Sequence, residues 1–196
     1  MSTTARRVVL SVLALVLAAG LGFPSAAAAK RFADSKDARE KDEPQAFLKD
    51  YDRLEKGKEA DWVLFAEGFD AKSFKTVSIA KFAATGKSSE SKDAAGAARD
   101  YLEQGVNGSN RLPWKVVAKG ADLVLLGNVF NAWEPNAAAE IFGDWMANPG
   151  AGLELIGKDR SGRIVFQIRH KSRGSTIEDA VENGLKKIVK ALEVGK

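Results

Sequence analysis

The chain of 196 residues contains no cysteine and a single histidine, His170. Without cysteine it forms no disulfide framework, zinc finger or iron–sulfur site, and it has no cysteine nucleophile. One histidine cannot make a three-histidine metal site, and a serine triad would depend on His170 alone. We interpret His170 as a histidine near the end of a strand rather than as a general base.

The chain also lacks a long run of charges of one sign. The 30 lysine and arginine residues and the 26 aspartate and glutamate residues are interleaved, most densely over residues 30–43. This pattern is typical of a solvated surface and differs from the basic stripe of a nucleic-acid-binding protein. We therefore expect no nucleic-acid partner. The hydrophobic content of 45% is that of a soluble globular protein.

Residues 1–29 have the three-part layout of a signal peptide. Arg6 and Arg7 come first, residues 8–21 carry no charge, and Ala27 and Ala29 precede Lys30. The apolar run is shorter than the roughly 20 residues of a membrane-spanning helix. We predict export to the periplasm, or secretion as the alternative, with no stable membrane span after cleavage. Two alternatives stay open: residues 1–29 remain as a membrane anchor, or the chain is exported by the twin-arginine route.

The rest of the chain predicts a charged flexible lead-in over residues 30–46 and a single α/β domain over residues 47–196. We expect the α+β kind: one mixed sheet of about five strands, two main helices packed on it, and a C-terminal helix. Helical spacing over 47–54 predicts a first short helix. Further helices are expected over residues 88–106 and 137–147, and a last one opens at the capping box Ser175-x-x-Glu178.

Strands are predicted over residues 62–65, 76–82, 114–118 and 123–126, followed by a hairpin around residues 159–162. In the second hairpin strand, Ile164, Phe166 and Ile168 alternate toward a core. The opposite face, with Val165, Gln167, Arg169 and Lys171, is expected to be largely wet. Gly150-x-Gly152 precedes a strand rather than a helix, which indicates a bend or bulge and not a phosphate loop.

The segment from Trp133 to Met146 gathers large apolar side chains in one connection between strands. Two interpretations stay open: a lid helix that buries its apolar face on the sheet, or an exposed patch that docks a partner. The partner-binding candidates are Trp133, Ile141, Phe142, Trp145 and Met146. No residue is assigned a catalytic, cofactor-binding or metal-binding role.

Short motifs carry a resemblance. Phe47-Leu48-x-Asp50-Tyr51-x-x-Leu54-x-x-Gly57 resembles the opening of an uncharacterised family of bacterial exported domains, many of them lipoproteins. Gly150-Ala151-Gly152-x-Glu154 and the Asp159-x-x-Gly162 hairpin are similar to segments of related domains of unknown function. The resemblance implies an envelope-facing α/β domain, similar in layout to the amino-terminal domain of envelope assembly proteins such as the translocation protein TolB. This chain departs from the lipoprotein pattern because it has no cysteine to lipidate.

Three functional hypotheses follow. The first is a non-enzymatic binding module of the cell envelope with an envelope protein as its partner. The second is a hydrolase that uses carboxylates or a divalent cation. The third is a carrier of a small apolar ligand under residues 133–146. The sequence leaves the oligomeric state open.

Overall fold

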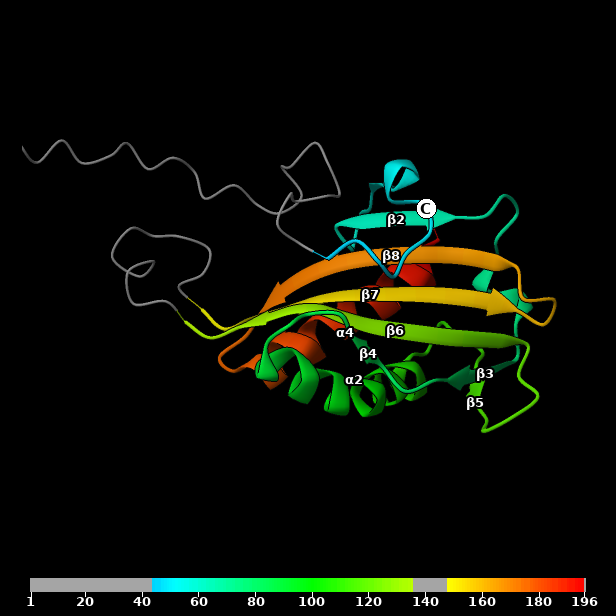
Figure 1. Cartoon of the computed structure of the whole chain (residues 1–196). Coiled ribbons are helices and arrows are strands. Elements are labelled where there is room, and N and C mark those ends of the chain that lie inside the picture. Colours follow the sequence, from blue (N-terminus) through cyan, green and yellow to red (C-terminus); the bar gives the residue numbers. More distant parts are fainter. Residues whose placement is uncertain (1–43, 136–147, 196) are drawn as a thin grey trace, which may run out of the picture. The chain divides into compact units, whose positions relative to one another are not determined.

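The computed structural model describes residues 44–135 and 148–195 of the chain. These residues form one mixed sheet with two long helices on one face (Figure 1). The α+β class is confirmed, but the sheet has eight strands and not about five. The two strands that the sequence did not predict, Glu55–Lys56 and Ala83–Ala84, have two residues each, which is too short for a hydrophobic alternation. The strands are β1 (Glu55–Lys56), β2 (Trp62–Phe65), β3 (Thr76–Ile79), β4 (Ala83–Ala84), β5 (Lys115–Val116), β6 (Leu123–Trp133), β7 (Gly150–Asp159) and β8 (Ile164–Arg173).

The strand order is β1-β2-β8-β7-β6-β3-β5, and β4 also pairs with β6. Strands β6, β7 and β8 are antiparallel neighbours at the centre, whereas β3, β4 and β5 are joined by parallel pairings. The predicted hairpin joins β7 to β8. Its turn places Gly162 at a φ of 82°, a left-handed conformation that glycine adopts without a steric penalty.

Two helices cover one face of the sheet. Helix α2 (Ser89–Gly108) begins as expected after Ser88, whose hydroxyl accepts the backbone N–H of Ser91. Helix α4 (Ile177–Val194) begins one residue later than its sequence signal indicates. Thr176 is the cap and accepts the N–H of Asp179, while the Ser175 hydroxyl bonds the Asp179 side chain.

The space between sheet and helices is the main apolar core. Its members are completely or almost completely buried. Strands β6, β7 and β8 contribute Leu123, Leu125, Leu153, Leu155 and Ile168, and helices α2 and α4 contribute Ala98, Leu102, Leu185, Ile188 and Leu192. Burial of this face supplies the hydrophobic stabilisation of the fold.

The opposite face is covered in part by residues 44–54, which we call the strap. The helix expected over 47–54 is wrong: only Tyr51–Arg53 form a single 3₁₀ turn, labelled η2. The strap instead lies against the sheet, where Leu48 and Leu54 pack with Trp62 and Ile156 in a second, smaller apolar cluster. Apolar residues at this spacing can form a helix face or pack along a sheet, and here they pack against β2 and β7.

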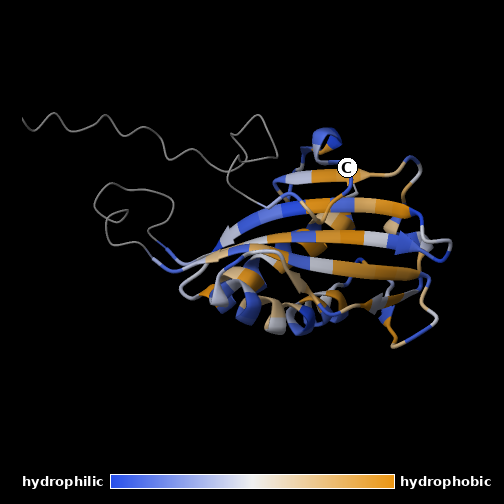
Figure 2. Cartoon of the chain, in the orientation of Figure 1, coloured by the Kyte–Doolittle hydropathy of each residue, from blue (hydrophilic) through white to orange (hydrophobic). Residues whose placement is uncertain are grey.

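The strap also changes the outer face of β8. The sequence predicts a largely wet face there, yet Gln167, Arg169 and Lys171 are all buried. Figure 2 shows why the sequence pattern indicates solvent: the C-terminal half of β8 is hydrophilic, although it lies within the sheet. Gln167 and Arg169 lie against strap residues and so lose contact with water.

The helix expected over 137–147 lies outside the described residues. Among the residues that are described, no helix has the length and apolarity needed to cross a membrane.

Candidate functional site

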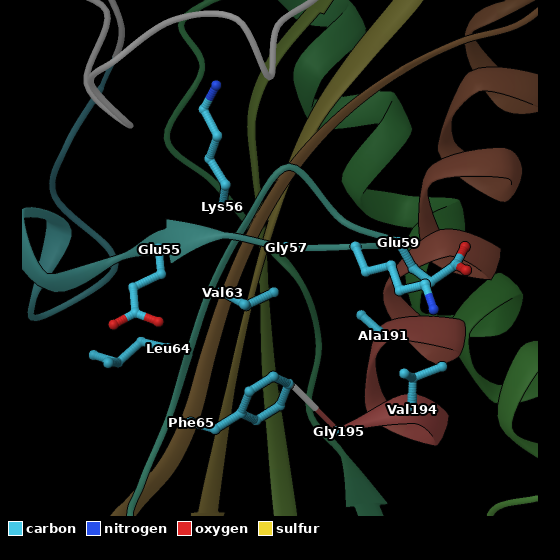
Figure 3. Close-up of a pocket in the computed structure, with 11 residues that line it drawn as sticks. Glu55, Lys56, Gly57, Glu59, Val63, Leu64, Phe65, Ala191, Val194 and Gly195 are labelled. Atoms are coloured by element: carbon cyan, nitrogen blue, oxygen red, sulfur yellow. The ribbon is translucent and has the colours of Figure 1, made fainter.

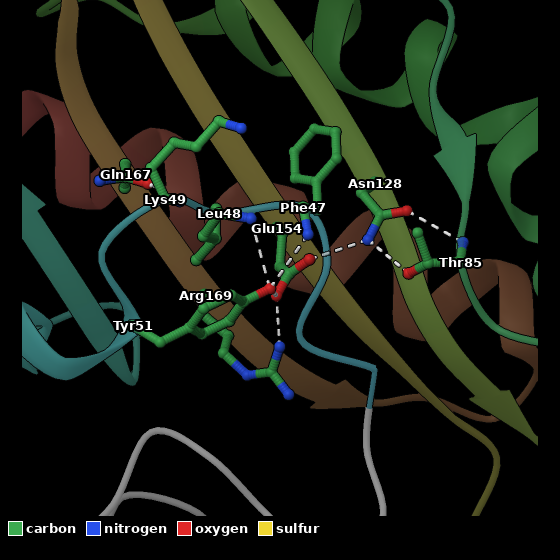
Figure 4. Close-up of polar contacts among 9 residues, drawn as sticks. All are labelled: Phe47, Leu48, Lys49, Tyr51, Thr85, Asn128, Glu154, Gln167 and Arg169. Carbon is green, nitrogen blue, oxygen red and sulfur yellow. Dashed lines mark hydrogen bonds and ion pairs between the residues drawn. The ribbon is translucent and has the colours of Figure 1, made fainter.

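A buried ion pair lies at the centre of the strap-covered face (Figure 4). Glu154 on β7 and Arg169 on β8 are cross-strand neighbours, and their side chains are in direct contact. Glu154 is 1% exposed and Arg169 is 2% exposed. Removing such charges from water is costly, so the pair depends on further hydrogen bonds from its surroundings.

The strap supplies one of these bonds. The Tyr51 hydroxyl donates to Glu154 Oε1 at 2.8 Å. The same hydroxyl accepts the backbone N–H groups of Phe47 and Leu48, at 3.4 and 3.3 Å. Tyr51 therefore ties the backbone of its own segment to the buried carboxylate.

Gln167 forms a second attachment between the strap and β8. Its Oε1 accepts the backbone N–H of Lys49 at 2.6 Å, and its Nε2 donates to Asp50 Oδ2 at 2.9 Å. One side-chain amide thus satisfies two groups of the strap.

Asn128 on β6 supports the carboxylate from the other side. Its Nδ2 donates to Glu154 Oε2 and to Thr85 Oγ1, each at 2.8 Å. Its Oδ1 accepts the Thr85 backbone N–H at 3.1 Å. Thr85 directly follows β4, so Asn128 also fastens that short strand to β6.

An aromatic ring covers the guanidinium. The Cζ atom of Arg169 lies 3.6 Å from the centre of the Phe130 ring, a cation–π distance. The ring lies over Gly152, where a Cβ would come within 2.4 Å of the ring carbons. Glycine at 152 therefore provides the close approach that Phe130 requires, beyond the bend that the sequence indicates.

Burial and charge shift two pKa values in this cluster. Burial raises the pKa of Glu154, and the Arg169 charge and the hydrogen bonds from Asn128, Tyr51 and Arg169 oppose the rise. The pKa of Tyr51 rises to about 12, first because of burial and then because of the adjacent Glu154 charge.

This arrangement is suited to holding structure. Both oxygens of Glu154 are already engaged by donors from three elements, so the carboxylate does not face a substrate space. The cluster joins the strap, β6, β7 and β8, and its chemistry is that of a polar clasp. Sequence reasoning missed it, although Glu154 between Leu153 and Leu155 was a signal: a carboxylate inside an apolar strand.

A groove lies at another place, between the outer edge of β2 and the end of α4 (Figure 3). Its volume is about 190 Å³, and Val63, Phe65, Ala191 and Val194 give it an apolar lining. Val194 is 41% exposed, and it is the exposed large apolar side chain of the described surface. The volume is below the roughly 300–1,000 Å³ of pockets that enclose a drug-sized ligand.

The edge of β2 beside this groove is partly open. Strand β1 pairs with Trp62 and Val63, so within the described residues no strand pairs with Leu64 and Phe65 on that side. Open backbone groups at a sheet edge can receive a further strand.

His170 is held by Asp61. Its Nδ1 accepts the Asp61 backbone N–H at 3.3 Å, and Asp61 Oδ2 lies 3.0 Å from the same ring nitrogen. The Lys171 N–H donates to the same Asp61 oxygen at 2.8 Å. These contacts fix the residue before β2 to β8. Because His170 is also only 8% exposed, its role is structural.

The structure describes one of the five partner-binding candidates. Trp133 ends β6, is buried, and donates from Nε1 to the Asn148 carbonyl at 3.0 Å. Ile141, Phe142, Trp145 and Met146 lie outside the described residues. Across residues 44–135 and 148–195, no three acidic or histidine side chains gather as metal ligands would.

No family model and no curated protein matches the chain. Solved structures resemble its fold. The PelC dodecamer from Paraburkholderia phytofirmans has a TM-score of 0.50 at 14% identity, over 67% of this chain and 94% of PelC. A DUF330 protein from Xanthomonas campestris has a TM-score of 0.35 at 16% identity, over 61% of this chain and 81% of its own.

A hypothetical protein from Chlamydia trachomatis has a TM-score of 0.36 at 10% identity, over 50% of this chain and 70% of its own. The likeness to PelC concerns the fold alone. The neighbours thus include proteins of unknown function, and the similarity to TolB stays a prediction.

The raised pKa of Tyr51 can be measured directly. The chain has two tyrosines, so Tyr101→Phe leaves Tyr51 as the sole phenol. We expect its phenolate absorbance to appear with a midpoint near 12 instead of near 10. Because the folded state favours the neutral phenol, this contribution to stability is complete below pH 10 and is lost as the pH rises to about 12. Glu154→Gln should lower the midpoint. A midpoint near 10 in both proteins would contradict the contact.

Proposed function

We propose that this chain is an exported, non-enzymatic binding module of the bacterial cell envelope that associates with further copies of itself. The signal-peptide pattern of residues 1–29 supports export, to the periplasm first and into the medium as the alternative. The resemblance of residues 47–54 and 150–162 to exported domains of unknown function supports the envelope setting.

The groove at the edge of β2 is the observation that carries the binding role. It combines an exposed apolar side chain, Val194, with an open stretch of sheet edge. A partner that adds a strand there would pair its backbone with β2 and bury apolar side chains against α4. The polar clasp, in contrast, is filled by the chain's own groups.

A second copy of the chain is the occupant that we favour. Glu55, Lys56, Lys58 and Glu59 surround the groove with both signs of charge, which suits a partner of equally mixed charge. The PelC structure that shares the fold is a dodecamer. Both observations support association between copies, and an edge strand is a common route to it.

Association can be tested on the mature chain, residues 30–196, by light scattering after size exclusion and by native mass spectrometry. We expect the wild type to form an oligomer. Val194→Glu should raise the dissociation constant of that oligomer at least tenfold, because association would remove the new carboxylate from water. Gln104→Glu, on the exposed side of α2, adds the same charge elsewhere and is the matched control.

A wild-type monomer at every concentration would contradict self-association. A bound small molecule in the native mass spectrum would instead support the ligand-carrier hypothesis. Recovery of the protein in the cytoplasmic fraction of the native cells would contradict export, whereas a full-length mass that keeps residues 1–29 would contradict cleavage alone.

A further inference from the structure

The two faces of the sheet are built from different side chains. On the helix-covered face, the buried residues of the central strands are aliphatic, for example Leu125, Leu155 and Ile168. On the strap-covered face, the same strands bury the apolar Phe130 and Ile156, but also Asn128, Glu154, Gln167 and Arg169. A face that is always covered is usually at least as stable with apolar side chains, because an ion pair loses its hydration there. Polar side chains remain compatible with water when the cover is absent.

The strap is held to the sheet without a ladder of backbone bonds. Within residues 44–54, the structure places no strand pairing, and a three-residue 3₁₀ turn is the one regular element. Leu48 and Leu54 are its buried apolar side chains, whereas Phe47 and Tyr51 are half-buried. Segments with few buried apolar contacts and no ladder of backbone bonds belong to the parts of a protein that open most easily.

Specific side-chain hydrogen bonds attach the strap to the sheet. Tyr51 reaches Glu154, and Gln167 holds Lys49 and Asp50. When these bonds break, every polar group involved can be hydrated, and Glu154 keeps Arg169 and Asn128 as partners. Opening therefore leaves no buried charge without a partner.

We propose that the strap is a displaceable cover that occupies a polar binding face in cis and opens while the sheet stays folded. In the closed state the ligand of this face is the chain's own segment. A segment that replaces it must offer the same chemistry: a hydroxyl for Glu154, a carboxylate for Gln167, and apolar side chains for Trp62 and Ile156. This device deepens the proposed binding role by adding a second surface, distinct from the groove.

Thiol labelling tests the opening without any partner. Because the chain has no cysteine, a single introduced thiol reports its own site. Ile156→Cys places it under the strap, and Leu155→Cys places it one residue away on the helix-covered face. In the absence of urea, we expect the thiol of Ile156→Cys to react at least tenfold faster than the thiol of Leu155→Cys. Its rate should depend little on the urea concentration. Leu155→Cys should react only through global unfolding, with a steep urea dependence.

Tyr51→Phe gives the second arm. It removes the bond to Glu154, and we expect it to accelerate labelling of Ile156→Cys by about fivefold or more. Equal rates and equal urea slopes at the two thiols would overturn the proposal, and so would labelling that Tyr51→Phe leaves unchanged. If the cysteine variants fold poorly, hydrogen exchange of the wild type decides: the amides of Leu48 and Lys49 should exchange long before those of Leu153 and Leu155.

These measurements use the purified chain and do not depend on association. If the protein assembles but the strap stays closed, the inference about the strap is overturned and self-association stands. If the strap opens but the protein is strictly monomeric, self-association is contradicted and the inference about the strap stands.

Discussion

Burial of the Glu154–Arg169 pair is the constraint on which the strap-covered half of the structure depends. Two charges taken out of water need donors and acceptors close at hand, and the strap and β6 provide them. Tyr51 comes from the strap, Asn128 from β6, and the Phe130 ring covers the guanidinium. Satisfying the pair therefore fixes the register of β7 against β8 and the position of the strap together.

The same pair separates the roles of the two sheet faces. The helix-covered face is apolar and accounts for most of the buried hydrophobic surface, so it sets the stability of the fold. The other face combines a small apolar cluster with a polar clasp, and its cover is a segment without regular pairing. The groove at β2 and α4 lies apart from that clasp. The apolar face thus supplies stability, and the proposed binding surfaces are the strap-covered face and the sheet edge.

The long elements could be predicted from local patterns. Ser88 marks the start of α2, and alternation with a turn at Asp159–Gly162 gives the hairpin of β7 and β8. The two-residue strands β1 and β4 could not be predicted, because tertiary pairing alone defines them. The clasp was missed for a similar reason: Gln167 and Arg169 carry the local signature of a wet face. They are buried by distant residues, namely the strap, over one hundred residues earlier, and the Phe130 ring.

The most direct test of this account is a double-mutant cycle on the pair, read as the free energy of unfolding in urea. Glu154→Gln and Arg169→Met should each destabilise the protein by about 3–5 kcal/mol, because each leaves a buried polar partner uncompensated. The double variant should lose much less free energy of unfolding than the sum of the two single losses. Single effects below about 1 kcal/mol that simply add would contradict the account, since the pair would then be a minor contact rather than the constraint that organises the strap.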